Sequence, residues 1–235
     1  TTNYTGNTVW IKRNVVPSEW QTNRFGDTII PLMPSERLKN ELKAMDFIRR
    51  HTDIPLPSVR SAFEDNERFY VILDHAPGIE LADLPEDKKA TAIAEVEKYL
   101  ATLRELKSSK MGALDGPTCL PHRLAIAFPR EEQERGLAFR PDVPYELVFC
   151  HGDLSQHNVL VDEATLKVTA ILDWEYAGFY PKEFEGLFYK RRGPSGAIGD
   201  EVSDVPMLLE MLKTCTISSG EGGELRKPTD SDGIE

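Results

Sequence analysis

The sequence predicts an α+β protein with two lobes, a small mixed α/β lobe over residues 1–73 and a mostly helical lobe over residues 78–217. Two observations lead to this prediction. Strand-like segments flank one amphipathic helix before residue 73, and a longer helical pattern follows a connector rich in proline and glycine. The 235 residues, 40% of them hydrophobic and 29% charged, have an ordinary globular composition, which excludes collagen-like, coiled-coil and disordered chains.

Strands in the small lobe are predicted from β-branched and aromatic side chains. Residues 8–12 (TVWIK) and 68–73 (RFYVIL) are rich in them, and residues 59–63 form a shorter candidate. Prolines interrupt residues 13–34, where we expect a loop insertion with a short strand at residues 28–30.

One helix is predicted in the small lobe, over residues 36–51, with Ser35 as its N-cap. Its apolar residues recur at helical spacing: Leu38, Leu42, Met45 and Ile48. Residues 74–77 form a hinge to the second lobe, which begins with a helix over residues 86–107. The apolar stripe of that helix is Ile93, Val96, Leu100 and Leu103.

The rest of the second lobe is less regular. Two short apolar segments, residues 147–150 and 168–172, flank polar clusters and suggest a hairpin that presents a site. A helix is expected to begin near Pro181 and to bury an aromatic run: Phe179, Tyr180, Phe184, Phe188 and Tyr189. Residues 205–212 are weakly helical, and residues 218–235 have the composition of a flexible tail.

Charge and composition exclude several classes of partner. The net charge is -11, from 39 acidic and 28 basic residues, which disfavours a protein that coats nucleic acid, because neutralising phosphates needs a basic face. No apolar stretch approaches the roughly 18 residues that would cross a bilayer, so we expect no membrane association. The cysteines, Cys119, Cys150 and Cys215, are odd in number and far apart, which is typical of a reducing compartment. We therefore expect a cytoplasmic protein.

The chemically informative segment is HGDLSQHNVLV, residues 151–161, which contains the pattern H-x-D-x4-N. Asp173 lies 15 residues beyond Asn158, at the end of the next apolar segment. Phosphoryl transfer needs a carboxylate that orients and deprotonates the attacking hydroxyl, and hard oxygen ligands for Mg²⁺ on the nucleotide phosphates. Asp153 can meet the first need, and Asn158 with Asp173 can meet the second.

Two other interpretations of this segment are open: Asp153 has a purely structural role, or the segment binds zinc. Asp153 alone is compatible with a buried carboxylate bonded to backbone amides. Together with His151 and His157 it is compatible with a zinc-hydrolase site. The register of Asn158 and Asp173 explains more residues, and we interpret His151 as a brace of the loop and Trp174 as a packing residue.

The segments HGDLSQHNVLVD and AILDWEYAGFYP resemble the aminoglycoside phosphotransferase-like and choline kinase-like kinases, in particular a fungal group of them. The resemblance extends to HTDIPLPSV and ILDHAPGIEL and spans most of residues 8–213. Gly152 where protein kinases have Arg, and Trp174 where they have Phe, favour the small-molecule branch. The resemblance implies a protein-kinase-like two-lobe fold, ATP and Mg²⁺ as cofactors, and a small-molecule hydroxyl as acceptor.

Residue by residue, the resemblance implies Asp153 as catalytic base and Asn158 and Asp173 as Mg²⁺ ligands. Lys12 resembles the strand lysine that contacts the nucleotide phosphates, and Glu41 its ion-pair partner. The backbone of the hinge is implied to bind adenine, above a pocket floor, through these residues: Leu73, Asp74, His75 and Ala76 in the hinge, and Leu160 and Ile171 in the floor.

The assignment of Lys12 has alternatives. Lys12 and Glu41 are 29 residues apart, a wide spacing for which the proline-rich insertion accounts. Lys12 is also compatible with an exposed strand lysine, and Glu41 with a solvated helix residue. Lys39 is a competing lysine, but it is only two residues from Glu41 and faces away from it on one helix.

Only eleven residues precede Lys12, too few for the two strands and Gly-rich turn that precede this lysine in such kinases. We therefore expect an N-terminally truncated lobe with an open sheet edge near residues 8–11, weak ATP binding, and self-association through that edge. The alternative function is a catalytically impaired kinase-like binding or scaffold protein. A protein kinase is disfavoured, since no activation segment follows Asp173.

Overall fold

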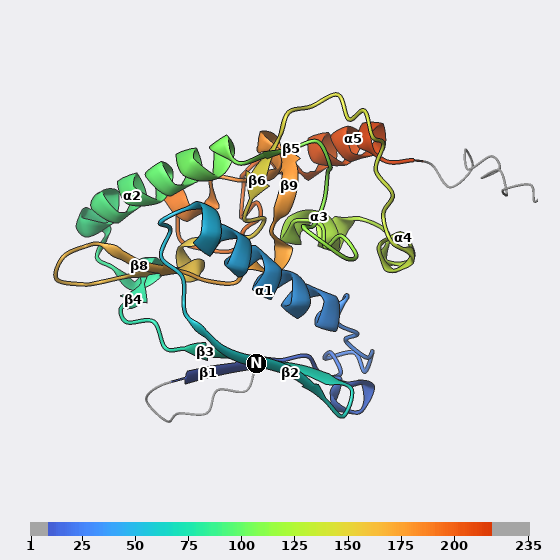
Figure 1. Cartoon of the computed structure of the whole chain (residues 1–235), viewed down its shortest axis with the longest axis horizontal. Coiled ribbons are helices and arrows are strands. Elements are labelled where there is room, and N and C mark those ends of the chain that lie inside the picture. The colour runs from blue at the N-terminus through green and yellow to red at the C-terminus, as the bar shows by residue number, and fades with distance from the viewer. Residues whose placement is uncertain (1–8, 218–235) are drawn as a thin grey trace, which may run out of the picture.

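A computed structural model describes residues 9–217 and shows an antiparallel three-stranded sheet at the start of the chain (Figure 1). The sheet has the order β1-β3-β2, formed by β1 (Val9–Arg13), β2 (Val59–Asp65) and β3 (Arg68–Asp74). The three predicted strands are therefore confirmed. Within the described residues β1 is an edge strand. The predictions for residue 8 and for the tail at residues 218–235 lie outside the described residues.

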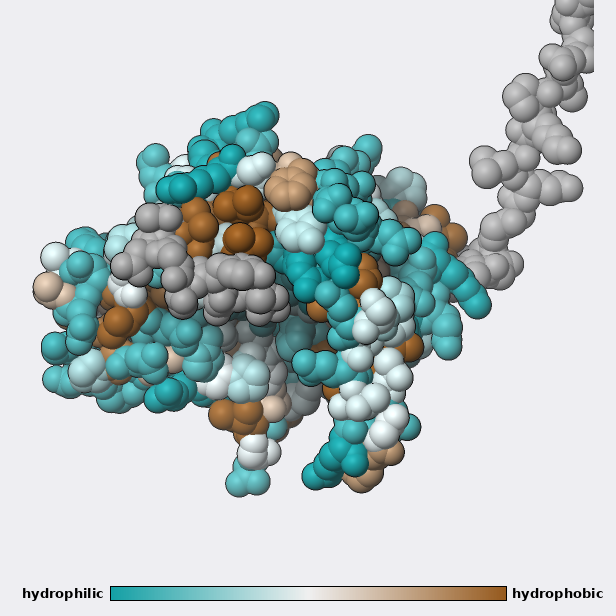
Figure 2. Space-filling model, turned by 90° about the horizontal axis from the view of Figure 1, so that it is seen from below, coloured by the Kyte–Doolittle hydropathy of each residue, from teal (hydrophilic) through white to brown (hydrophobic). Residues whose placement is uncertain are grey.

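Local sequence sets the turn between β2 and β3. Asn66 and Glu67 both adopt left-handed backbone conformations, with φ values of 47° and 63°. Two such residues in sequence match the right-handed twist of the strands in a two-residue hairpin. All residues of β2 except Val59 are exposed, and polar residues cover most of this side of the molecule (Figure 2).

Helix α1 (Pro34–His51) lies between this sheet and the rest of the chain (Figure 1). Its apolar side chains Ala44, Met45 and Ile48 are buried. The predicted N-cap Ser35 is wrong, because the helix already begins at Pro34, whose missing N–H costs nothing in the first turn.

The insertion before α1 contains no strand at residues 28–30, only an isolated bridge between Thr22 and Thr28. A short 3-10 turn at Pro17–Glu19 anchors it instead. The Glu19 carboxylate accepts hydrogen bonds from Arg13 at 2.7 and 2.9 Å, which fastens the insertion to the end of β1.

The second part of the chain combines helices with two small sheets, and it is less helical than predicted. Its helices are α2 (Glu86–Glu105), α3 (His122–Ala127), α4 (Arg130–Arg135) and α5 (Val205–Cys215). One sheet has the order β4-β7-β8, from β4 (Ile79–Glu80), β7 (Val159–Val161) and β8 (Val168–Ile171). The other has the order β5-β6-β9, from β5 (Lys107–Ser108), β6 (Leu147–Cys150) and β9 (Gly178–Pro181).

The predicted hairpin between residues 147–150 and 168–172 is wrong. Strand β8 pairs with β7, which is closer in sequence, and β6 pairs with β9 and β5. A short turn joins β7 to β8, whereas the loop of residues 151–158 carries the chain from one sheet to the other. The polar cluster therefore lies between two sheets.

The predicted helix near Pro181 is also absent. Residues Gly178–Pro181 form strand β9, which is buried throughout and adds to β6, and two 3-10 turns follow at Lys182–Phe184 and Phe188–Lys190. Aromatic side chains suit a strand as well as a helix, and Gly186 disfavours a continuous helix. The predicted helix at residues 205–212 is confirmed as part of α5.

Two observations on residues 9–217 bear on membrane association and on the state of the cysteines. No helix in this range is both long and apolar enough to cross a membrane. All three cysteines are free and buried.

Candidate active site

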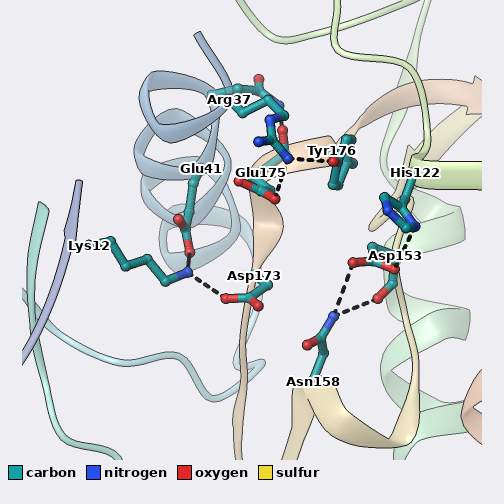
Figure 3. A network of polar contacts seen from close by, with 10 residues as sticks. Lys12, Arg37, Glu41, His122, Asp153, Asn158, Asp173, Glu175 and Tyr176 are labelled. Carbon is teal, nitrogen blue, oxygen red and sulfur yellow. Dashed lines mark hydrogen bonds and ion pairs between the residues drawn. The ribbon is translucent and has the colours of Figure 1, made fainter. Parts of the chain in front are cut away.

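A cavity of about 560 Å³ lies between the first sheet, α1 and the β7–β8 hairpin, a volume in the range of small-ligand sites. The predicted hinge and the predicted pocket floor therefore border one cavity. Ten of the eleven residues predicted for the site line it: Lys12, Glu41, Leu73, Asp74, His75, Ala76, Asn158, Leu160, Ile171 and Asp173. Asp153 is the exception and lies beyond Asn158 (Figure 3).

Lys12, on β1, reaches across the cavity between two carboxylates (Figure 3). Its Nζ donates a hydrogen bond to Glu41 Oε1 at 2.5 Å and another to Asp173. Burial alone would lower the pKa of Lys12, but the charges of Glu41 and Asp173 outweigh burial and raise this pKa. The amine therefore stays protonated. Burial raises the pKa of the Glu41 carboxyl, and Lys12 opposes that effect.

The structure decides between the alternatives for this pair. The Lys12 side chain is only 18% exposed, and that of Glu41 1%, so neither is a solvated surface residue. Lys39 pairs with Glu64 at 2.5 Å, away from Glu41. The predicted ion pair between Lys12 and Glu41 is confirmed.

The backbone presents Asp173 in an unusual conformation. Asp173 follows β8 with φ 60° and ψ 53°, a left-handed geometry that costs a non-glycine residue about 1–2 kcal/mol. Hydrogen bonds on both sides hold it: Leu172 N donates to Asn158 O at 2.8 Å, and Trp174 Nε1 donates to Ile171 O at 3.0 Å. Trp174 is fully buried, so its interpretation as a packing residue is confirmed.

The loop that carries Asp153 is fixed from within the protein. The buried Glu185 carboxylate accepts hydrogen bonds from the backbone N–H groups of His151 and Gly152. His151 Nε2 lies 2.8 Å from Leu172 O, and the N–H of Asp153 donates to His151 Nδ1 at 3.2 Å. His151 therefore braces the loop, as predicted, and links it to the segment before Asp173.

Gly152 is required by this geometry. Its φ is +82°, and a Cβ at this position would lie 2.6 Å from the carbonyl oxygen of Tyr176. Gly116 has the same φ of +82° but open space around it. A substitution at Gly116 therefore introduces the backbone strain without the steric clash.

We expect Gly152→Ala to destabilise the protein more than Gly116→Ala. Left-handed strain costs about 1–2 kcal/mol in both variants, and the clash adds about 1–3 kcal/mol to Gly152→Ala alone. The measurement is the free energy of unfolding from urea titration. Equal losses in the two variants would show that Tyr176 moves aside without cost.

Asp153 is oriented by its neighbours and stays accessible, with 22% of its side chain exposed. Asn158 Nδ2 donates to the backbone oxygen of Asp153 at 2.7 Å and lies 3.5 Å from Oδ2. His122 Nδ1 lies 3.9 Å from Asp153 Oδ1 on the other side. In Figure 3, Asp173 and Asn158 lie between Lys12 and Asp153. A partly exposed carboxylate in this position can accept a proton from a bound hydroxyl.

The donor set at the cavity fits Mg²⁺. Because Asn158 Nδ2 is engaged by Asp153 O, the amide oxygen of Asn158 is left for a ligand. Asp173 contacts Lys12 through Oδ1 and is 43% exposed. Mg²⁺ is commonly held by one or two such side chains together with phosphate oxygens and water.

The zinc-site reading does not fit. Within residues 9–217 no group of three His, Cys, Asp or Glu side chains is arranged to hold a metal ion. His157 instead pairs with Glu80 at 2.7 Å, at the wall of the cavity.

Several residues of the site were not predicted from the sequence. Trp10 lines the cavity and stacks on His75 with ring centroids 5.6 Å apart. Trp10 lies two residues before Lys12 and therefore on the same face of the strand, a pattern from which it could have been predicted. Arg37 contacts Glu175 and Tyr176, and its place one turn before Glu41 is another such signal. His122 had no signal, because residues 108–145 show no periodic pattern.

A strand lysine paired with a helix glutamate, facing an Asp-x4-Asn loop and a later aspartate, is the arrangement of a kinase-like phosphotransferase fold. The chain belongs to the phosphotransferase enzyme family APH, whose sequence model matches residues 21–185. The resemblance stated from the motifs is confirmed at the level of this family; the fungal group stays a prediction.

Two bacterial relatives and two solved structures are similar to the chain. The aminoglycoside 3'-phosphotransferase of Streptomyces fradiae is 26% identical over 159 residues, which are 58% of this chain and 57% of that protein. That of Streptomyces ribosidificus is 26% identical over 160 residues, 58% of each chain. The chain thus spans less than two thirds of the length of these relatives.

Among solved structures, aminoglycoside phosphotransferase APH(3'')-Id from Streptomyces rimosus has a TM-score of 0.48 and 18% identity, and the match covers 69% of each chain. A thermostable mutant of APH(4)-Ia, in a ternary complex with ADP and hygromycin B, has a TM-score of 0.44 and 21% identity, over 63% of this chain and 58% of that one.

Proposed function

We propose that the protein transfers the γ-phosphoryl group of ATP to a hydroxyl of a small molecule, through a two-lobe kinase fold. The observation that carries the proposal is the line of groups from Lys12, held by Glu41, through Asp173 and Asn158 to Asp153. This line provides a cation for phosphates, oxygen ligands for a metal and a carboxylate for the acceptor, in that order.

The cavity suits a nucleotide. Its apolar floor, formed in part by Leu160 and Ile171, and the connector residues Leu73 and Ala76 suit a planar base. Lys12 at the other end suits the phosphates, because its amine stays protonated between two carboxylates. Asn158 and Asp173 would hold Mg²⁺, which supplies charge neutralisation on the phosphate oxygens.

Asp153 acts on the acceptor. Its carboxylate accepts the proton of the acceptor hydroxyl as the new oxygen–phosphorus bond forms, and the bond between the γ-phosphorus and the bridging oxygen of ADP breaks. His151 and Glu185 keep the loop in place during this step, because they bind its backbone.

The acceptor is proposed by class only, a small molecule with a free hydroxyl. The similar Streptomyces proteins are named for aminoglycosides, and they supply the first compounds to test. A screen of amino sugars, aminoalcohols and sugars for ADP release tests the function, with Asp46→Asn as control, an exposed carboxylate paired with Arg50. Acceptor-dependent ADP release supports the proposal, and its absence across the panel favours the binding or scaffold protein.

A further inference from the structure

The face of α1 that carries Glu41 is polar in its first turns and apolar further along the helix. Arg37 lies three residues before Asn40 and four before Glu41, so all three belong to one side of the helix. The face continues one turn later as apolar, with Ala44 and Met45 fully buried. Asn40 is 2% exposed, so its polar groups are costly unless they are paired.

Glu41 pairs with Lys12 on β1, whereas the partners of Arg37 and Asn40 lie just after Asp173 in the chain. Arg37 donates to Glu175 Oε1 at 2.9 Å and to the hydroxyl of Tyr176 at 2.5 Å (Figure 3). Asn40 Nδ2 donates to the backbone oxygens of Glu175 at 3.0 Å and Ala177 at 2.9 Å. These four hydrogen bonds tie α1 to residues 174–177, and we call them the α1 clamp.

The clamp joins two elements that must keep a fixed separation. Glu41 on α1 sets the position of Lys12, whereas residues 174–177 follow the left-handed backbone of Asp173. A left-handed non-glycine residue persists only where its surroundings hold it. Asp173 is 43% exposed, so packing of its own side chain does not fix it.

We propose that Arg37 and Asn40 are positioning residues that hold the Asp173 segment against α1, so that Lys12 and Asp173 keep a fixed separation. The consequence for nucleotide binding rests on the proposed function. The clamp itself rests only on the contacts of α1.

The test compares Arg37→Met with Lys39→Met by hydrogen exchange and calorimetry. Lys39 is a matched control, because it is on the same helix and its ion pair, to Glu64, lies outside the site. In Arg37→Met we expect amides of residues 173–177 to exchange about tenfold faster, the effect of losing a charged hydrogen bond. Affinity for Mg²⁺-ATP falls by a similar factor while affinity for adenosine is retained. Lys39→Met behaves as wild type.

Further variants keep the proposal open to contradiction. Arg37→Lys should restore part of the protection, because one ammonium can reach one of the two partners. Glu175→Gln keeps the side-chain size and tests the same link if Arg37→Met does not fold. The double variant with Glu175→Gln should exchange no faster than Arg37→Met alone, since Arg37→Met already removes the Arg37–Glu175 interaction that Glu175→Gln weakens.

The proposal is overturned if Arg37→Met and Glu175→Gln leave residues 173–177 as protected as in wild type, or if exchange rises equally over the whole chain. Exchange is measured without nucleotide. A protein that binds no ATP would therefore contradict the proposed function, while the exchange data would still decide whether the clamp holds the Asp173 segment.

Discussion

Asp153→Asn is expected to lower phosphoryl transfer by about 10²–10⁴, the usual contribution of a general base. Asparagine keeps the shape of the side chain but cannot take the proton of the acceptor hydroxyl. The backbone oxygen that accepts from Asn158 is unchanged, so the loop geometry is retained. Affinity for Mg²⁺-ATP should therefore stay within a few-fold of wild type.

The measurement is turnover at saturating ATP, together with nucleotide affinity by calorimetry. Asp46→Asn makes the same chemical change at an exposed site on α1 and should leave turnover unaffected. Near-normal turnover in Asp153→Asn would show that this carboxylate is not the base.

Asp173→Ala is expected to remove the effect of Mg²⁺ on ATP binding. Loss of a partner in a metal site commonly costs about 10–100-fold in metal affinity, so Mg²⁺-ATP should bind at least about tenfold more weakly. The substitution also frees Lys12 from one of its two carboxylates. ATP without metal should therefore bind as well as in wild type or better, and adenosine should be unaffected.

Calorimetry with ATP, Mg²⁺-ATP and adenosine separates these terms. Asp115→Ala is the control, because it removes an exposed ion pair with Lys43. If Asp173→Ala weakened adenosine as much as Mg²⁺-ATP, Asp173 would be a structural residue rather than a metal ligand.

The residues that lie together were easier to predict from the sequence than the fold around them. Asn158 and Asp173 line one cavity and Asp153 lies beyond Asn158, whereas their roles in catalysis and metal binding stay predictions. The pair of Lys12 and Glu41 was also predicted, although the link crosses 29 residues. The pair forms because β1 and α1, which carry Lys12 and Glu41, lie where their local sequence patterns predicted a strand and a helix.

Long-range pairing was the part that the sequence did not reveal. Strand β6 pairs with β5 and β9 rather than with β8, and nothing in the apolar pattern of a short buried strand specifies its neighbours. The aromatic run after Phe179 suits a strand or a helix equally well, and tertiary pairing decided it. Arg37 and Asn40 acquire their role only through contacts with residues about 135 positions away.

The most direct test of the central claim is phosphorus NMR of ATP, Mg²⁺ and the acceptor panel with wild-type protein and Asp153→Asn. The account predicts that a phosphomonoester signal grows as the γ-phosphate signal of ATP declines, in wild type and hardly at all in the variant. ATP that binds, as calorimetry would show, but yields neither phosphomonoester nor ADP with any hydroxyl compound or with water would contradict the assignment as a phosphotransferase.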